Sequence, residues 1–220
     1  MSPRLKDSSL QHLEKIAICH KQCFEGSFSV KLGKAYLIKS FEWFLAGENR
    51  FLNHVEDEDE NIIGYCGGFI SLRIGDGSTS GMMQYGMKQA AFGILKKPSL
   101  LFNAELRPFY PLVIKNIFRK ILPKRKSIND HSSSPQPFEK RIGLVVIGVH
   151  PDFRGKGIFE MLMKNFDEQA LQRRINKLSL SVKSSNTRAV AAYKKAGWQI
   201  SFEEKKNAFI MTKILNPDER

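Results

Sequence analysis

The sequence predicts a single α/β domain built around one mixed β-sheet, and three observations carry this prediction. The chain has 220 residues, enough for one ordinary domain with an insertion but short for two full-sized ones. Residues 141–214 alternate between strand-like and helix-like patterns, as α/β sheets do. Residues 8–72 read as two helices followed by two strands. We therefore expect one domain over residues 1–220, with an insertion and linker at about 75–140.

Composition and charge exclude several classes of protein. Hydrophobic residues make up 42% and charged residues 26% of the chain, which fits neither a disordered chain nor a fibrous repeat. No apolar run approaches the roughly 20 residues that a membrane-spanning helix needs. Three cysteines are no disulfide framework, and the first residues lack the apolar stretch of a secretory signal. We therefore expect a cytoplasmic protein with reduced thiols.

The first part of the chain is predicted to form two helices and a hairpin. Ser8 and Ser9 can cap a helix, whose apolar positions recur at helical spacing. These positions are Leu10, Leu13, Ile16, Ala17 and Cys23. A second helix is predicted over 30–46, and its expected buried stripe is Leu32, Tyr36, Leu37, Phe41, Phe44 and Leu45. Strands at 50–55 and 61–72 follow, joined by an acidic turn.

The last part of the chain has the more regular pattern. The stretch RIGLVVIGV at 141–149 is apolar and β-branched, as expected of a buried strand. A helix from about 157 to 174, a strand KLSLSV, and a helix at 186–196 follow it. Two further strands are predicted near 198–203 and 208–214. This order completes a mixed sheet.

A basic segment between the two parts holds most of the excess charge. The chain carries +13 overall, and residues 82–126 contain ten lysines and arginines against one acid, Glu105, a net +9. Helical pieces broken by prolines are expected there. The interpretation we favour places them over the acceptor end of the sheet, with cations facing an anionic substrate. They could instead lie on an acidic membrane surface or form the contact of a homodimer.

The loop after the buried strand is suited to an anionic phosphate group. The strand ends at Val149, Pro151 breaks it, and Arg154-Gly155-Lys156-Gly157 leads into a helix. Unpaired amides at a helix N-terminus point outward, the helix dipole adds positive potential, and glycines let the backbone approach closely. Neither common nucleotide loop fits, because the chain has no GxxxxGKS/T and no GxGxxG after the strand.

Two blocks of sequence resemble the GNAT superfamily of acyl-CoA-dependent N-acyltransferases. The loop is similar to the family's R/Q-x-x-G-x-G/A motif: Arg154 and Gly157 match, and Phe159 stands where the family has a small residue. The stretch NTRAVAAYKKAGW resembles the family's N-x-x-A-x-x-x-Y-x-x-x-G-F/W segment. It places Asn186, Ala189, Tyr193, Gly197 and Trp198 in register. The resemblance covers about residues 141–215. The first 72 residues agree in element order alone, and residues 75–140 match no pattern of the family.

The resemblance implies a fold and a set of site residues. The fold is the GNAT mixed central sheet, with the helical insertion between strands three and four. The backbone of Ile147, Gly148 and Val149 should bind the pantetheine arm, and Asn186 should contact the cofactor. The pyrophosphate should lie on the amides of Arg154, Gly155, Lys156, Gly157, Ile158 and Phe159. Tyr193 should act as general acid toward the departing CoA thiolate, and a strand amide should meet the oxyanion.

The resemblance therefore predicts an N-acetyltransferase that uses acetyl-CoA as cosubstrate and a primary amine as acceptor. The helical opening is loosely similar to acetyltransferases of bacterial surface-polysaccharide pathways, which favours a small-molecule amine such as an amino sugar. A protein amine is the alternative within the enzyme class. From a different class, the chain could be a polyanion-binding or membrane-surface module on a CoA-binding scaffold. We expect no specific nucleic-acid partner.

The sequence also contains one possible metal-ligand cluster and several candidates for the general base. Cys19, His20 and Cys23 share one short helix without a fourth ligand, so packed thiols are expected there and no metal. The general base stays open, because the strand at 141–149 has no carboxylate. The candidates are Glu139, Glu105, His150 and a chain of water molecules.

Overall fold

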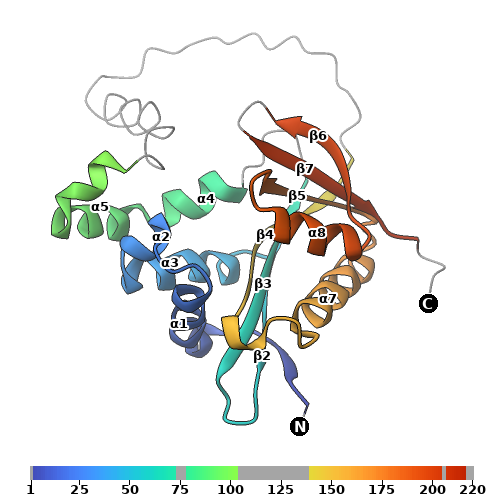
Figure 1. The fold of residues 1–220 in the computed structure, drawn as a ribbon, viewed down its shortest axis with the longest axis horizontal. Helices are drawn as coiled ribbons and strands as arrows, with labels where there is room; N and C mark the ends of the chain where they lie inside the picture. The colour runs from blue at the N-terminus through green and yellow to red at the C-terminus, as the bar shows by residue number, and fades with distance from the viewer. Residues whose placement is uncertain (1, 73–77, 104–138, 205–206, 217–220) are drawn as a thin grey trace.

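The computed structural model describes residues 2–72, 78–103, 139–204 and 207–216, which form a seven-stranded mixed sheet with helices on both faces (Figure 1). The strands are β1 (Arg4–Asp7), β2 (Arg50–Glu56), β3 (Ile62–Ser71), β4 (Arg141–Val149), β5 (Lys177–Lys183), β6 (Gln199–Glu204) and β7 (Ala208–Ile214). Their order in the sheet is β1-β2-β3-β4-β5-β7-β6. Only β4 and β5 run parallel among these pairs. The predicted mixed α/β fold is confirmed.

Two groups of helices cover the two faces of this sheet (Figure 1). On one face lie the 3-10 turn η1 (Leu10–His12) and helices α1 (Leu13–Cys23), α2 (Phe28–Lys31) and α3 (Lys34–Leu45). On the other face lie α7 (Ile158–Gln172) and α8 (Thr187–Lys195). The short η4 (Pro151–Phe153) connects β4 to α7. Because α7 links the two parallel strands, β4-α7-β5 is a crossover unit of the kind that α/β folds use.

Each face of the sheet has its own hydrophobic core. The first core joins α1 and α3 to β2 and β3, and among its buried residues are Ile16, Phe41, Phe44 and Tyr65. The second joins α7 and α8 to the middle of the sheet, and among its buried residues are Leu162, Phe166, Leu178 and Met211. The sheet therefore divides the domain into an α1 face and an α7 face.

The structure differs from the sequence prediction at three places before residue 50. Strand β1 was not predicted, because RLKD is a four-residue edge strand with Leu5 as its one apolar residue. Leu10 is 68% exposed rather than buried, since it begins a 3-10 turn that precedes α1. The helix predicted over 30–46 is two helices. Gly33, with φ of 100°, separates them.

The parallel pair β4–β5 separates part-way along the sheet. The two strands pair from Ile142↔Leu178 to Leu144↔Leu180, and β4 continues to Val149 without a partner on that side among the described residues. On its other edge β4 stays paired with β3, with a bulge opposite Gly67 and Gly68. Backbone groups of β4 beyond Leu144 are consequently available to a ligand on the β5 side.

The described part of the insertion packs on α3. It comprises α4 (Ser78–Tyr85), α5 (Met87–Lys96) and the 3-10 turn η2 (Pro98–Phe102), which confirms a helical insertion between β3 and β4. Gly93 brings α5 against α2–α3 so closely that a Cβ there would lie 2.3 Å from the Leu32 carbonyl oxygen. Glu105 lies outside the described residues. No helix in the described part of the chain is long and apolar enough to cross a membrane.

Candidate active site

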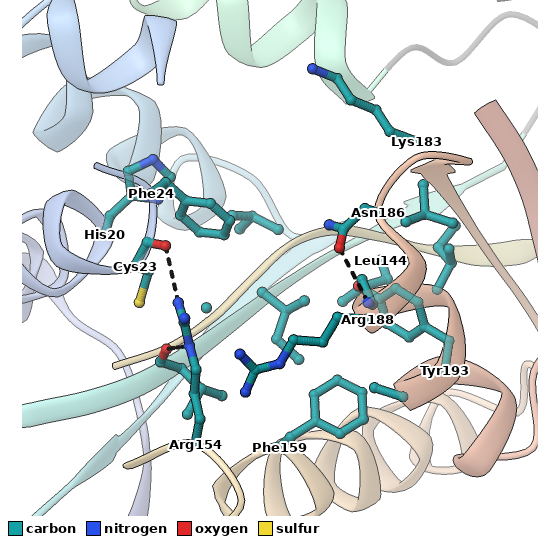
Figure 2. Close-up of a pocket in the computed structure, with 18 of the residues that line it drawn as sticks. His20, Cys23, Phe24, Leu144, Arg154, Phe159, Lys183, Asn186, Arg188 and Tyr193 are labelled. Atoms are coloured by element: carbon teal, nitrogen blue, oxygen red, sulfur yellow. Dashed lines mark hydrogen bonds between the residues drawn. The ribbon is translucent and has the colours of Figure 1, made fainter. Parts of the chain in front are cut away.

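A cleft of about 700 Å³ opens where β4 leaves β5 (Figure 2). The end of α1 and the α1–α2 loop form one wall, β4 the floor, and β5 with α8 the other wall. Eight of the residues predicted for the site line it: Ile147, Gly148, Val149, Arg154, Gly155, Phe159, Asn186 and Tyr193. The structure thus brings the two sequence blocks to one cavity.

The loop between β4 and α7 requires glycine at two positions. Gly155 and Gly157 have φ of 78° and 80°, in the left-handed region that L-residues rarely adopt. Nothing lies within 4 Å of a Cβ built at either position, so the space beside the loop is open. Helix α7 has 15 residues and begins directly after Gly157. Its first amides and its dipole therefore favour an anion at this end of the cleft, which is where the sequence predicts the pyrophosphate.

Three predicted site residues do not line the cleft. The Lys156 ammonium lies 5.1 Å from the centre of the Phe153 ring, and Lys156 belongs to a smaller neighbouring pocket. Gly157 has no side chain, and Ile158 is 2% exposed and packs in the core of the α7 face. A role for Gly157 and Ile158 in phosphate binding can therefore come only from their backbone amides, whereas the Lys156 amide donates to the Phe153 carbonyl oxygen at 3.4 Å. That role stays a prediction.

Arg154 ties the loop to the opposite wall of the cleft. Its Nε donates to the carbonyl oxygen of Val149 at 3.2 Å, and one Nη donates to the carbonyl oxygen of Cys23 at 3.1 Å. Figure 2 shows Arg188 extending from α8 into the cleft toward Arg154. Two guanidinium groups thus approach one region of the cavity, which favours an anionic ligand there.

Tyr193 stands on the α8 wall with its ring buried. Burial raises the pKa of the Tyr193 phenol well above its ordinary value of 10, so the hydroxyl is protonated at neutral pH. Among the described residues this hydroxyl has no hydrogen-bond partner, which leaves its proton available to a ligand in the cleft. Asn186 caps α8 as predicted, because its side chain accepts from the Ala189 amide at 3.2 Å. Gly197 follows the helix with φ of 86°, as expected of a C′ glycine.

Sequence reasoning missed the α1 side of the cleft. His20, Cys23, Phe24, Ser27 and Ser29 line it, more than 110 residues before β4 in the chain. No motif marks them, and only folding brings α1 beside β4. Arg188 was also missed, although it lies inside the second sequence block, one residue before Ala189.

The base candidates taken from the sequence lie elsewhere. Glu139 is ion-paired with Lys177 at 2.6 Å, beside the first residue of β5. His150 follows β4, and its Nδ1 accepts from the Asp152 amide at 3.3 Å. Neither residue lines the cleft. Glu105 is outside the described residues.

Two clusters of metal-ligating residue types have partners within the protein. Cys19 and Cys23 lie with their sulfurs 3.8 Å apart in a thiol contact at the end of α1, as packed thiols do. His12, His54 and Glu56 offer ligand atoms within 4.8 Å of one another. The Glu56 carboxylate is, however, ion-paired with Lys6 at 2.6 Å and hydrogen-bonded to His54 at 3.1 Å. A protein cation thus already neutralises that carboxylate.

The known proteins that this chain resembles are acetyltransferases. A model of the acetyltransferase (GNAT) family matches residues 127–198, which include the Arg154 loop and the Tyr193 helix. The fold is similar over 98% of the chain to two solved structures, each covered over its full length. One is arylalkylamine N-acetyltransferase 2 of Aedes aegypti (TM-score 0.59, 14% identity). The other is the PaiA N-acetyltransferase of Thermoplasma acidophilum in complex with coenzyme A (TM-score 0.57, 12% identity).

Residues 127–198 of the chain are thus similar to the GNAT acetyltransferase family. Curated relatives that are also acetyltransferases match a shorter stretch of the sequence. An acetyltransferase of Sodalis glossinidius is 29% identical over 73 residues, 33% of this chain and 49% of that protein. An acetyltransferase of Pectobacterium atrosepticum is 34% identical over 53 residues, 24% of this chain and 38% of that protein. The chain thus spans half or less of the length of these relatives.

Proposed function

We propose that this protein transfers an acetyl group from acetyl-CoA to a primary amine, as GNAT enzymes do. The observation that carries the proposal is the cleft between β4 and β5, which has an anion-binding loop at one end and Tyr193 on its wall. The match of residues 127–198 to the GNAT family supports the reaction class.

The residues present fit acetyl-CoA along the whole cleft. Backbone groups of Ile147 and the amide N–H of Val149 can hydrogen-bond a pantetheine arm, whereas the Val149 carbonyl oxygen accepts from Arg154. Gly148 lets the strand lie against Tyr65, since a Cβ there would lie 2.6 Å from the Tyr65 side chain. The amides at the start of α7 and the charges of Arg154 and Arg188 suit the phosphates.

Tyr193 supplies the proton that the leaving group needs. Attack of the acceptor nitrogen on the thioester carbonyl forms the C–N bond, and the C–S bond breaks with its electron pair left on sulfur. The sulfur of CoA leaves more readily when a proton is delivered to it, because the departing group is then a thiol rather than a thiolate. Because burial keeps the Tyr193 phenol protonated, Tyr193 can donate to the sulfur from the α8 wall. Asn186 fixes the start of the same helix and so its orientation.

For the acceptor we propose a small-molecule amine such as an amino sugar, with a protein amine as the alternative. The lining of the cleft favours an anionic acceptor, because Lys183 adds a third cation to the two arginines that suit the CoA phosphates, against one carboxylate, Glu160. A cytoplasmic location stays a prediction.

A panel of acceptors tests the reaction. Thermal unfolding with and without acetyl-CoA reports cosubstrate binding. Release of the CoA thiol is then measured with glucosamine, glucosamine 6-phosphate, tyramine, spermidine and a peptide that begins with alanine. We expect the fastest release with a phosphorylated amino sugar. A protein that acetyl-CoA does not stabilise and that releases no CoA with any amine would contradict the proposal.

One observation favours a second function, contact with an anionic membrane surface. Residues 82–103 contain three lysines and no carboxylate. Three apolar side chains of the same segment are exposed: Phe92 at 57%, Leu95 at 76% and Phe102 at 85%. None of the described residues of the insertion lines the cleft. A basic, apolar outer face of this kind suits the interface of an anionic bilayer better than a substrate lid.

A further inference from the structure

The cleft of this enzyme passes through the sheet, and its two ends have different chemistry. Tyr193 packs in the core of the α7 face, whereas His20 and Tyr65 lie on the α1 face, where the buried rings of Phe41 and Tyr65 meet. Both Tyr193 and His20 line the same cavity, and Figure 2 shows them on opposite walls. The separation of β4 from β5 opens the passage between them.

Direct transfer of the acetyl group from acetyl-CoA to the amine needs a proton donor and a proton acceptor at different places. The donor must reach the sulfur that leaves, and the acceptor must reach the nitrogen that attacks. With Tyr193 on the α8 wall as donor, the acceptor belongs on the other side of the thioester, which is the α1 wall. Among the described residues that line this wall, the groups able to take a proton are His20 and Cys23.

We propose that His20 is the general base of the transfer reaction and takes the amine proton through Ser29. The proposal rests on the proposed function, because a base is needed only if an amine is acetylated. In the step, the attacking nitrogen gives its proton to the Ser29 hydroxyl oxygen while the Ser29 hydroxyl proton moves to His20 Nε2. The nitrogen lone pair forms the new C–N bond, the sulfur takes the electrons of the C–S bond, and Tyr193 protonates it.

The hydrogen bonds of His20 suit both of its protonation states. Nε2 lies 3.2 Å from Ser29 Oγ, and Nδ1 lies 2.5 Å from the Tyr65 hydroxyl. Both partners are hydroxyl groups, which can donate or accept. The neutral ring can donate from Nδ1 to Tyr65 and accept from Ser29. The imidazolium can donate to both, so the ring gains a proton without losing a hydrogen bond.

The surroundings of His20 keep it unprotonated until the reaction takes place. Its side chain is buried against the rings of Phe24 and Phe41, and burial lowers the pKa of the imidazole to about 4. The titratable and charged groups around it are Cys19 and Cys23 on α1, Tyr65 on β3 and Arg154 on the α7 side, bonded to the Cys23 carbonyl. No carboxylate is among them to hold His20 as a cation.

The path from His20 to the open cleft is a chain of hydroxyl groups. Ser29 Oγ lies 3.1 Å from Ser27 Oγ, and both serines line the cavity. Ser27 also caps α2, since it accepts from the Val30 amide, so the first turn of α2 positions this chain. Tyr65 does not reach a ligand itself, because its side chain is fully buried. It is a positioning residue that holds the imidazole by Nδ1.

The test compares His20→Gln with the wild-type protein. Glutamine retains a polar side chain of similar length but cannot take a proton. Acetyl-CoA binding is read from thermal stabilisation, and transfer is followed as CoA release with hydroxylamine and with the five amines of the acceptor panel. We expect kcat to fall by roughly 10²-fold, as is typical for a lost general base, while the acceptor KM and the acetyl-CoA affinity change less than about threefold. His12→Gln, at a histidine that does not line the cleft, is the matched control and should keep the wild-type rate.

Two further variants keep the test decisive if His20→Gln does not fold. Ser29→Ala removes the hydroxyl that passes the proton and should lower kcat by about tenfold while acetyl-CoA still binds. In His20→Gly, added imidazoles should restore activity, with a rescued rate that rises with the pKa of the imidazole. If the added imidazoles only filled the space left by His20, the rescued rate would not depend on their pKa.

The outcomes separate this proposal from the proposed function. Wild-type transfer that persists undiminished in His20→Gln and Ser29→Ala overturns the role of His20 and leaves the transferase intact. Loss of acetyl-CoA stabilisation together with kcat also overturns it, since His20 would then be structural. A wild-type protein that binds acetyl-CoA but acetylates no amine and no hydroxylamine overturns the proposed function, and the base with it.

Discussion

The ring of Phe159 lies 5.8 Å from the ring of Tyr193, tilted by 58°. Phe159 stands where the family motif has a small residue, and the structure shows what occupies the extra volume. Its ring, on the first turn of α7, supports the face of the proposed general acid. The proposed anion site at the start of α7 would use backbone amides, which do not depend on the side chain at position 159.

We predict that Phe159→Ala lowers kcat by a few-fold and leaves acetyl-CoA binding nearly unchanged. Without the phenyl ring, Tyr193 loses an aromatic contact worth about 1 kcal/mol and samples more orientations. Steady-state kinetics and thermal stabilisation by acetyl-CoA check this result. A loss of acetyl-CoA affinity larger than the loss of kcat would mean that Phe159 serves the cofactor rather than Tyr193.

Tyr193→Phe tests the proton donor directly. The substitution keeps the ring that packs against Phe159 and Trp198 and removes only the hydroxyl. Turnover should fall by roughly 10²-fold, and the acetyl-CoA affinity should barely move. Tyr36→Phe, in the core of the α1 face, is the matched control. Equal losses of folding stability and turnover in Tyr193→Phe would assign this tyrosine a packing role.

Gly157→Val should abolish stabilisation by acetyl-CoA in a protein that still folds. The φ of 80° is strained for valine, and the new side chain would occupy the open space beside the first amides of α7. Gly33→Val is the matched control: its φ of 100° imposes similar strain, nothing lies within 4 Å of its Cβ, and it is remote from the loop. Undiminished acetyl-CoA binding in Gly157→Val would refute the assignment of the loop.

The sequence predicted the parts of the fold that depend on local pattern. Strand β4 has the predicted bounds, and α7, α8 and β5 agree to within a residue or two, because period, caps and glycines are local signals. The sequence did not predict the α1 wall, because His20 and Ser29 come to line the cleft only when α1 packs against β3 and β4. A hydrogen bond between residues 45 positions apart, such as His20 to Tyr65, leaves no trace in any window of sequence.

The pH dependence of stability provides a further prediction for His20. Burial lowers the pKa of its imidazole from 6.5 to about 4, so the unfolded chain binds a proton at a pH where the folded one does not. Stability from this residue is therefore present above pH 6.5 and is lost as the pH falls toward 4, by up to about 3 kcal/mol.

The comparison with His20→Gln isolates that contribution. Urea unfolding at neutral pH and near pH 4.5 gives the free energy of unfolding of both proteins. We expect the stability advantage of the wild type over the variant to shrink on acidification, since glutamine does not titrate. His54 and the carboxylates are common to both proteins and cancel in the difference. A gap that stays constant would mean that the pKa of His20 is not lowered.

The last prediction concerns the outer face of the insertion, which we define as Phe92, Leu95 and Phe102 with Lys88, Lys96 and Lys97. The ring of Phe92 lies 4.5 Å from the Lys96 ammonium, so apolar and cationic groups share one surface. Such a surface can insert its apolar side chains at a bilayer interface while each lysine gains about 1 kcal/mol from anionic lipid. A cation cluster proposed from the sequence, Lys115, Arg119 and Lys120, lies outside the described residues, so the test uses the described ones.

We predict that the protein co-sediments with phosphatidylglycerol vesicles at low salt and not with phosphatidylcholine vesicles. The triple variant Phe92→Ser, Leu95→Ser, Phe102→Ser and the triple variant Lys88→Glu, Lys96→Glu, Lys97→Glu should each lose this binding. The matched control is Phe202→Ser on β6, since Phe202 is 61% exposed with no part in this face. The acceptor KM should be unchanged in both triple variants, because none of these residues lines the cleft. A raised acceptor KM without any vesicle binding would instead show that the insertion closes over the substrate, as the sequence first suggested.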